Sequence, residues 1–177
     1  MKINKTIFLI LGGAAILWAL SRYTQTGRNI VQTITDAGVN MIAQFEGFSA
    51  RAYNDPPGSS KWSIGFGHQI LPGEEKYMTS EITVAEGRAL LADDTLKAQN
   101  AIRSVITFPL TAAQFDALTS FVYNVGVTAF KTGTVPGKIN AGNFAAAAAT
   151  MRQYNKAGGV FNQVLADRRD KEASAFA

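Results

Sequence analysis

Two carboxylates suited to acid–base catalysis lie in one short stretch, which runs from Phe45 to His68 and reads FEGFSARAYNDPPGSSKWSIGFGH. Glu46 ends an apolar run with helical spacing, whereas Asp55 lies in a turn rich in Asn, Pro, Gly and Ser. Because burial and neighbouring groups change how readily a carboxyl ionises, the two should titrate differently. A protonated Glu46 can act as a general acid while an ionised Asp55 acts as a base, a combination that cleaves glycosidic bonds.

Other interpretations of this stretch remain open. Glu46 can be a surface glutamate at a helix end, Asp55 an ordinary turn residue and Ser63 an ordinary strand hydroxyl. Ser63, His68 and Asp55 also suggest the triad of a serine hydrolase. However, the sequence lacks the sharp strand-to-helix turn that exposes such a nucleophile. We therefore expect His68 to form local hydrogen bonds that hold the turn of a small sheet.

Composition limits the class of protein. The chain has 177 residues, 47% of them hydrophobic, which is enough for one domain with a substantial core. Its net charge of +4 and pI near 9.4 favour polyanionic surfaces, but the basic residues are scattered, which argues against a nucleic-acid partner. With no cysteine and one histidine, we expect no disulfide and neither a thiolate nor a multi-histidine metal site. We expect a monomer that needs no cofactor.

The N-terminus resembles a membrane segment. Lys2 and Lys5 precede an uncharged run from Thr6 to Leu20, which spans about 22 Å as a helix against a hydrocarbon core of about 30 Å. We predict a transmembrane or signal-anchor helix at 1–23 and a polar tether at 24–34. A permanent anchor, a releasable anchor and a cleaved signal remain open, whereas basic residues at both ends argue against a buried core helix. The two lysines favour a cytoplasmic N-terminus, so the rest should face the periplasm or cell wall.

The pattern of the remaining residues, 35–177, predicts an α+β domain that is mostly helical, with a small antiparallel sheet near its start. Capping residues at Thr35, Thr83, Thr111 and Asn143 each mark the start of a helix. The predicted helices are 35–46, 83–106, 112–123, 143–154 and 161–176, the predicted strands are 51–53 and 62–66, and 125–142 is predicted to be a loop.

These residues resemble the phage-type lysozymes, the muramidases of glycoside hydrolase family 24. The resemblance rests on FEGFSARAYNDPPG, SIGFGH, TVAEGRALLADD, AAQFDALTSFVYNVGVTAF and DRRDKE, and it covers about residues 35–177. It implies a lysozyme-like fold, peptidoglycan as substrate, and Glu46, Asp55 and Ser63 as catalytic residues. Two features depart from the family's usual pattern, because Ser63 replaces a more usual Thr and the turn before it is longer than in the shortest members.

The resemblance also implies supporting residues. Tyr123 and Asn124 are expected to contact the sugar. Arg168 and Arg169 resemble a closing basic pair, one of which holds Glu46; the alternative is a solvated helix surface shared with Asp167, Asp170 and Glu172.

The implied function is cleavage of the β-1,4 bond between N-acetylmuramic acid and N-acetylglucosamine. Such an enzyme serves host lysis from the inner membrane, or entry when carried in a phage particle or virion membrane. One rival is a membrane-anchored virion or cell-wall structural protein that keeps the fold without catalysis. A second is a lytic transglycosylase, which needs no base to activate water.

Overall fold

The structure, a computed structural model, describes residues 32–177. The predicted membrane segment at 1–23 and most of the predicted tether at 24–34 lie outside these residues. Within the described part, no helix combines the length and the apolar character needed to cross a membrane.

The described part begins with a helix followed by a small sheet. Helix α2 (Asp36–Glu46) starts at Thr35, whose side chain accepts a hydrogen bond from the Gly38 amide, and it ends at Gly47, where φ is 70°. A positive φ suits glycine, so Gly47 stops the helix directly after Glu46. Strands β1 (Ser49–Asn54), β2 (Trp62–Gly65) and β3 (His68–Gln69) then form an antiparallel sheet in the order β1-β2-β3. The predicted helix and sheet are both confirmed.

The next segment departs from the prediction of one long helix. After the short 3-10 helix η2 (Glu75–Met78), two helices, α3 (Val84–Asp94) and α4 (Leu96–Val105), replace it and meet at Thr95. The hydroxyl of Thr95, which is fully buried, donates to the Ala92 carbonyl at 2.6 Å and accepts from the Gln99 side chain at 2.8 Å. These hydrogen bonds connect the end of α3 to the start of α4 at the junction of the two helices.

Helices form the rest of the described chain. Helix α5 (Ala112–Val125) starts with the predicted capping box of Thr111 and Gln114, and α8 (Phe144–Met151) starts at the predicted cap Asn143. The last helix, α9 (Gln163–Phe176), starts at Asn162, slightly later than predicted.

Two predictions for this region were wrong. The expected loop at 125–142 contains helices α6 (Val127–Thr132) and α7 (Val135–Asn140). A hairpin of β4 (Lys156–Ala157) and β5 (Val160–Phe161) also precedes α9 where no strands were expected. Glycines and a proline suggested a loop at 125–142, yet Phe130, Val135 and Ile139 are buried, and this tertiary packing supports helices too short to be stable alone.

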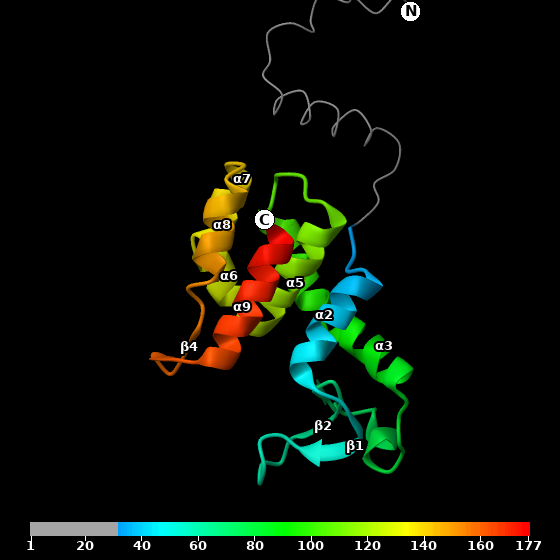
Figure 1. The fold of residues 1–177 in the computed structure, drawn as a ribbon. Helices are drawn as coiled ribbons and strands as arrows, with labels where there is room; N and C mark the ends of the chain where they lie inside the picture. Colours follow the sequence, from blue (N-terminus) through cyan, green and yellow to red (C-terminus); the bar gives the residue numbers. More distant parts are fainter. Residues whose placement is uncertain (1–31) are drawn as a thin grey trace, which may run out of the picture. The chain divides into compact units, whose positions relative to one another are not determined.

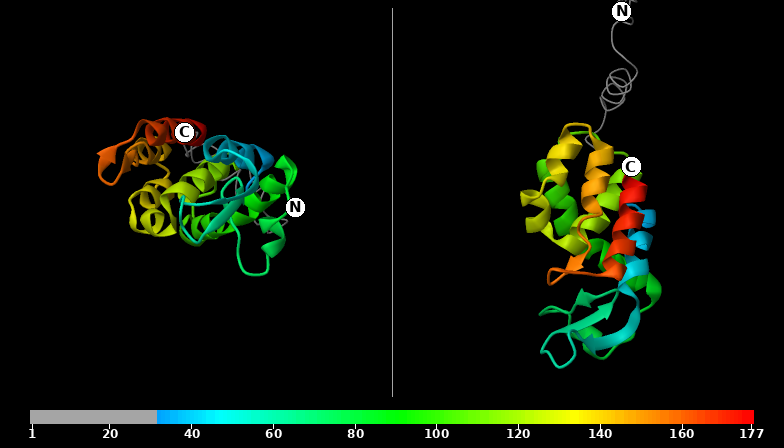
Figure 2. Two further views of the ribbon diagram at one scale, coloured as in Figure 1. Left: turned by 90° about the horizontal axis from the view of Figure 1, so that it is seen from below. Right: turned by 60° about the vertical axis from the view of Figure 1, so that its left-hand side comes forward.

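The helices and the sheet form two adjoining groups (Figure 1). Helix α5 packs against α2, α4 and α9, while α8 packs against α7 and α9. Figure 2 shows the sheet at one end of this helical group, with α3 beside it. One core lies within the helical group around Phe115, Leu118, Phe121 and Phe176, and a second cluster around Ile42, Phe66 and Leu91 joins α2 and α3 to the sheet. Glu46 and Asp55 flank strand β1, at the end of α2 and in the turn before β2 respectively.

Candidate active site

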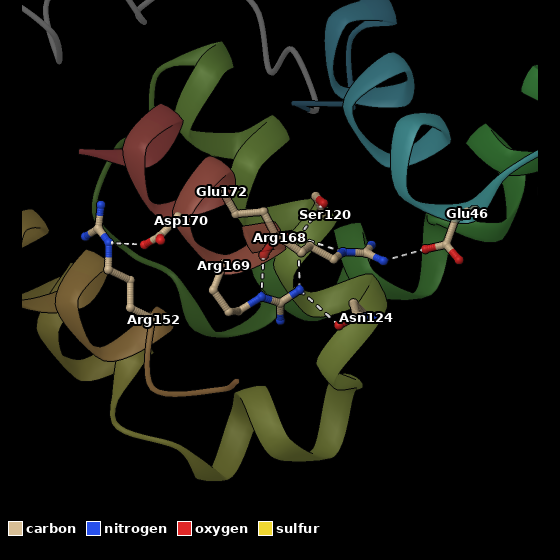
Figure 3. A network of polar contacts seen from close by, with 8 residues as sticks. All are labelled: Glu46, Ser120, Asn124, Arg152, Arg168, Arg169, Asp170 and Glu172. Carbon is tan, nitrogen blue, oxygen red and sulfur yellow. Dashed lines mark hydrogen bonds and ion pairs between the residues drawn. The ribbon is translucent and has the colours of Figure 1, made fainter. Parts of the chain in front are cut away.

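Glu46 is the last residue of α2, and its side chain is 25% exposed. The helix places it there because Val39, Ile42 and Ala43 are buried on the preceding turns. Arg168, on α9, donates from Nη1 to Oε1 of Glu46 at 2.6 Å (Figure 3). This charge-assisted bond joins residues 122 positions apart and links α2 to α9.

Arg168 and Arg169 are both buried, so the alternative of a solvated helix surface is wrong. The guanidinium of Arg168 lies over the ring of Phe45, 4.7 Å from its centre, and that of Arg169 lies over Phe121 at 5.1 Å. Arg169 donates from Nη2 to the side-chain oxygen of Asn124 at 2.9 Å. The two arginines thus point to different parts of the site, Arg168 to Glu46 and Arg169 to Asn124.

A buried carboxylate, Glu172, accompanies both arginines. Its Oε1 accepts hydrogen bonds from Ser120 Oγ at 2.6 Å and from Arg168 Nε at 3.1 Å. Arg169 donates to the same oxygen from Nη2 at 3.2 Å, and its Nε lies 2.9 Å from Oε2 in an ion pair whose angle is poor for a hydrogen bond. Burial raises the pKa of Glu172 against the opposing effect of Arg169, and burial lowers the pKa of Arg169 to about 10.

Asp55 lies in the exposed turn between β1 and β2. Its backbone amide donates to the carbonyl of Lys61 at 3.1 Å, and the side-chain amide of Asn54 donates to the carbonyl of Ser59 at 3.1 Å. These bonds close the turn and leave the Asp55 side chain at the surface. The two predicted catalytic carboxylates therefore differ in setting, with Glu46 partly buried against a cation and Asp55 exposed.

Tyr53 is influenced by both carboxylates. Burial first, and then the negative charges of Asp55 and Glu46, raise the pKa of Tyr53. Tyr53 lies on β1 and pairs across the sheet with Ser63. Tyr53 was not among the predicted site residues, although its position two residues before Asp55 placed it on the predicted strand.

Ser63 is buried on β2, with 3% of its surface exposed. It lies between Tyr53 on β1 and Gln69 on β3 in the sheet register. The Ser63 hydroxyl is thus shielded from bulk solvent, whereas the Asp55 side chain is exposed.

Tyr123 and Asn124 are adjacent at the end of α5 but face different surroundings. Tyr123 packs against the cluster of Val39, Ile42 and Phe66, and burial followed by the charges of Glu46 and Asp94 raises its pKa. Asn124 is exposed and lines a pocket of about 440 Å³. The pocket is lined by Asn124, Val125, Gln153, Tyr154, Lys156 and Leu165.

His68 is buried and contacts two carboxylates. We expected local hydrogen bonds, but one of the two partners, Asp94, lies 26 positions further along the chain. Its Nδ1 lies 2.9 Å from Asp94 Oδ1 on α3, and its Nε2 lies 3.0 Å from Glu74 Oε2. Both ring nitrogens are thus engaged away from Ser63, an arrangement unlike a serine-hydrolase triad. Within residues 32–177, no group of three or more potential ligand side chains is arranged to hold a metal ion.

The mostly helical fold with its small antiparallel sheet is that of a lysozyme-type domain, and comparisons with known proteins agree. The phage lysozyme family model matches residues 43–172, so the chain belongs to the phage lysozyme family. A solved P22 lysozyme mutant superposes with a TM-score of 0.74 at 32% identity, covering 81% of this chain and 97% of that one.

Two phage relatives match to different extents. The chain is 36% identical to the endolysin of Bacillus phage B103 over 81% of its own length and 53% of that protein. It thus spans about half the length of the Bacillus phage endolysins that it matches. The SAR-endolysin of Enterobacteria phage PA-2 is 34% identical over 97% of this chain and 93% of the relative.

Proposed function

We propose that this protein is a peptidoglycan hydrolase that cleaves the β-1,4 bond between N-acetylmuramic acid and N-acetylglucosamine. The observation that carries the proposal is that Glu46, partly buried against Arg168, and the exposed Asp55 have different surroundings, while the charges of both act on Tyr53. Membership of the phage lysozyme family supports the substrate class, and one of the similar solved structures is a muramidase domain.

In the proposed mechanism, Glu46 protonates the leaving glycosidic oxygen. Asp55 remains ionised, stabilises positive charge on the sugar ring and activates the attacking water, with Ser63 helping to hold that water. Tyr123 and Asn124 contact the sugar from the end of α5. Because an ionised Glu46 cannot donate a proton, Glu46 must be protonated in the reactive complex, where its carbonyl oxygen can still accept the hydrogen bond from Arg168.

We propose host lysis from the membrane as the setting. The match with the SAR-endolysin of phage PA-2 covers 97% of this chain, and so includes residues of the predicted membrane segment. That match supports an N-terminal segment with a role in localisation, and the domain would then act in the periplasm or on the cell wall.

The test is Glu46→Gln. A neutral amide keeps the size of the side chain but cannot donate a proton as an acid, so hydrolysis should fall about 100-fold or more while the circular dichroism spectrum stays unchanged. New reducing ends released from purified peptidoglycan measure the rate, and mass spectrometry of the products separates hydrolysis from anhydro-muropeptide formation.

Glu81→Gln is the matched control, because Glu81 also pairs with an arginine, Arg51, but on the exposed surface. It should retain wild-type activity. A Glu46→Gln protein that remains fully active would remove the assignment of the acid. A wild-type protein that releases no fragments would instead support the non-catalytic structural role.

A further inference from the structure

The buried carboxylate of Glu172 holds the arginine that faces Glu46. We propose that Glu172 is a positioning residue, whose carboxylate fixes the guanidinium of Arg168 and thereby the place of the Glu46 carboxyl group. The inference rests on the proposed role of Glu46 as the acid. It goes beyond that role because it assigns a function to Glu172, which acts on Glu46 only through Arg168.

A single guanidinium, that of Arg168, contacts both carboxylates. Arg168 is held by Glu172 at Nε, 3.1 Å away, and contacts Glu46 through Nη1 at 2.6 Å, so its opposite edges meet two different carboxylates (Figure 3). Because the guanidinium is planar and rigid, fixing the Nε edge also fixes the direction of Nη1. The Phe45 ring lies against the face of the same group, 4.7 Å from it, and limits its tilt.

Burial of the Glu172 carboxylate has a cost in free energy. Glu172 is fully buried, and a buried ion pair often contributes no more to stability than apolar residues of similar volume. The Ser120 hydroxyl donates to Glu172 at 2.6 Å, so α5 holds the carboxylate as well. An arrangement that is costly to bury yet tightly held favours a positioning role over a contribution to stability alone.

Glu172 also contributes to the charge balance of the buried cluster. Arg168 and Arg169 are two adjacent buried cations, and Glu172 neutralises one of them. An ionised Glu46 neutralises the other. Loss of the negative charge of Glu172 would leave this buried cluster more positive beside Glu46, and more positive surroundings favour the ionised form of a carboxyl group over the protonated form that an acid needs. Lys171, whose ammonium lies 5.2 Å from the centre of the Phe45 ring, also faces this region. Its charge, and those of Tyr53, Tyr123, Asp55 and Asp94, are not altered by the substitution.

Helix α9 supplies a matched control. Asp170 lies two residues before Glu172 and pairs with Arg152 at 2.9 Å, but this pair is exposed (Figure 3). Asp170→Asn therefore removes one acid from the same helix and breaks one arginine pair, with no contact to Arg168.

The experiment compares Glu172→Gln with Asp170→Asn in the full chain, using soluble peptidoglycan fragments. For Glu172→Gln we expect kcat to fall about 10- to 100-fold with KM within about twofold, as expected for a misplaced catalytic group. We also expect the alkaline limb of its pH–rate profile to move to lower pH. Asp170→Asn should match the wild type in kcat, KM and pH profile.

Ser120→Ala keeps every charge and covers the case in which Glu172→Gln does not fold. Losing one hydrogen bond to Glu172 should lower kcat about two- to fivefold without raising KM. The inference is overturned if folded Glu172→Gln matches Asp170→Asn in kcat and pH profile. If Glu172→Gln is unfolded, an unchanged kcat in Ser120→Ala overturns it.

Wild type and Glu46→Gln, measured in the same assay, separate this inference from the proposed function. A wild-type protein that releases no reducing ends overturns both. An active wild type with an inactive Glu46→Gln variant keeps the proposed function, whatever Glu172→Gln shows.

Discussion

The Nδ1 atom of His68 lies 2.9 Å and 3.0 Å from the two carboxylate oxygens of Asp94. Its other ring nitrogen contacts Glu74, which also accepts a hydrogen bond from the Leu71 amide at 2.9 Å. His68 thereby ties strand β3 both to α3 and to the segment before η2. The structural role of this histidine is to join three parts of the chain near the sheet.

The first prediction is a pH dependence of stability that comes from His68. Burial alone would lower the pKa of His68, but the hydrogen bonds to Asp94 and Glu74 and their charges outweigh it and raise the pKa. A group whose pKa is higher in the folded state stabilises the protein fully below its unfolded value, near 6.5, and this contribution is lost as pH rises through the folded value.

The measurement is urea unfolding of the wild type and His68→Gln between about pH 6 and pH 9. The difference in free energy of unfolding should be about 1–3 kcal/mol at the acid end and should shrink toward the alkaline end. Because the chain has one histidine, no other imidazole contributes. The pKa values of the two partners shift in opposite directions, since burial raises the pKa of Asp94 whereas the hydrogen bond from the Leu71 amide lowers that of Glu74. A difference that stays constant across this range contradicts the pairing.

Local signals in the sequence predicted most helix starts, and tertiary packing explains the errors. The caps at Thr35, Thr83, Thr111 and Asn143 are confirmed, because capping is a contact between residues three apart. Helix α7 was missed because Pro136 suggested a break. Pro136 lies in the first turn of α7, where the lack of a backbone N–H costs little because the amides of the first turn have no acceptor within the helix.

The candidate site was partly predictable for a similar reason. Glu46, Asp55 and Ser63 lie within one short stretch, so their spacing could suggest chemistry directly. The role of Glu172 could not be predicted, because nothing local separates it from the exposed acids Asp167 and Asp170 on the same helix. Its burial depends on Ser120 and α5, 52 residues earlier in the chain.

The second prediction concerns the close approach of α2 and α5 at Gly38. A Cβ atom at Gly38 would lie 2.6 Å from both Asp116 Cγ and Ile34 Cγ1. Asp116 in turn accepts a hydrogen bond from the Thr35 amide at 2.8 Å, so the start of α2 would be displaced. Gly38→Ala should therefore lower the free energy of unfolding by about 1–3 kcal/mol, although alanine is the better helix former.

Gly137→Ala is the matched control for thermal or urea unfolding. Gly137 lies in α7 without a positive φ, and a Cβ atom added there would have no neighbouring atom within 4 Å. This substitution should raise the free energy of unfolding by about 0.4–1 kcal/mol. If both substitutions stabilise the protein, the α2–α5 contact is looser than the structure indicates.

The third prediction is the stereochemistry of the product. Inversion needs room for a water between the base and the sugar, and the exposed position of Asp55 in its turn favours such an arrangement. We expect the α-anomer of the new reducing end to form first, as followed by proton NMR during the first minutes of hydrolysis. Early formation of the β-anomer would instead assign Asp55 as a nucleophile, and Asp55→Asn should be inactive in either case.

The last prediction concerns the N-terminal segment. Among residues 32–177, the buried residues that form the two cores lie between Val39 and Phe176, and the family match lies between residues 43 and 172. Because the family match begins well after the first 23 residues, deletion of Met1–Tyr23 should give a soluble protein that retains peptidoglycan hydrolysis.

Fractionation of cells gives the complementary measurement. Full-length protein should sediment with membranes, whereas the protein lacking Met1–Tyr23 should remain in the supernatant. Fractionation before and after collapse of the membrane potential then separates a permanent anchor from a releasable one, since a releasable segment leaves the membrane and a permanent one stays. If the truncated protein is folded but inactive, the N-terminal segment takes part in catalysis, because the folded domain alone would then be insufficient for hydrolysis.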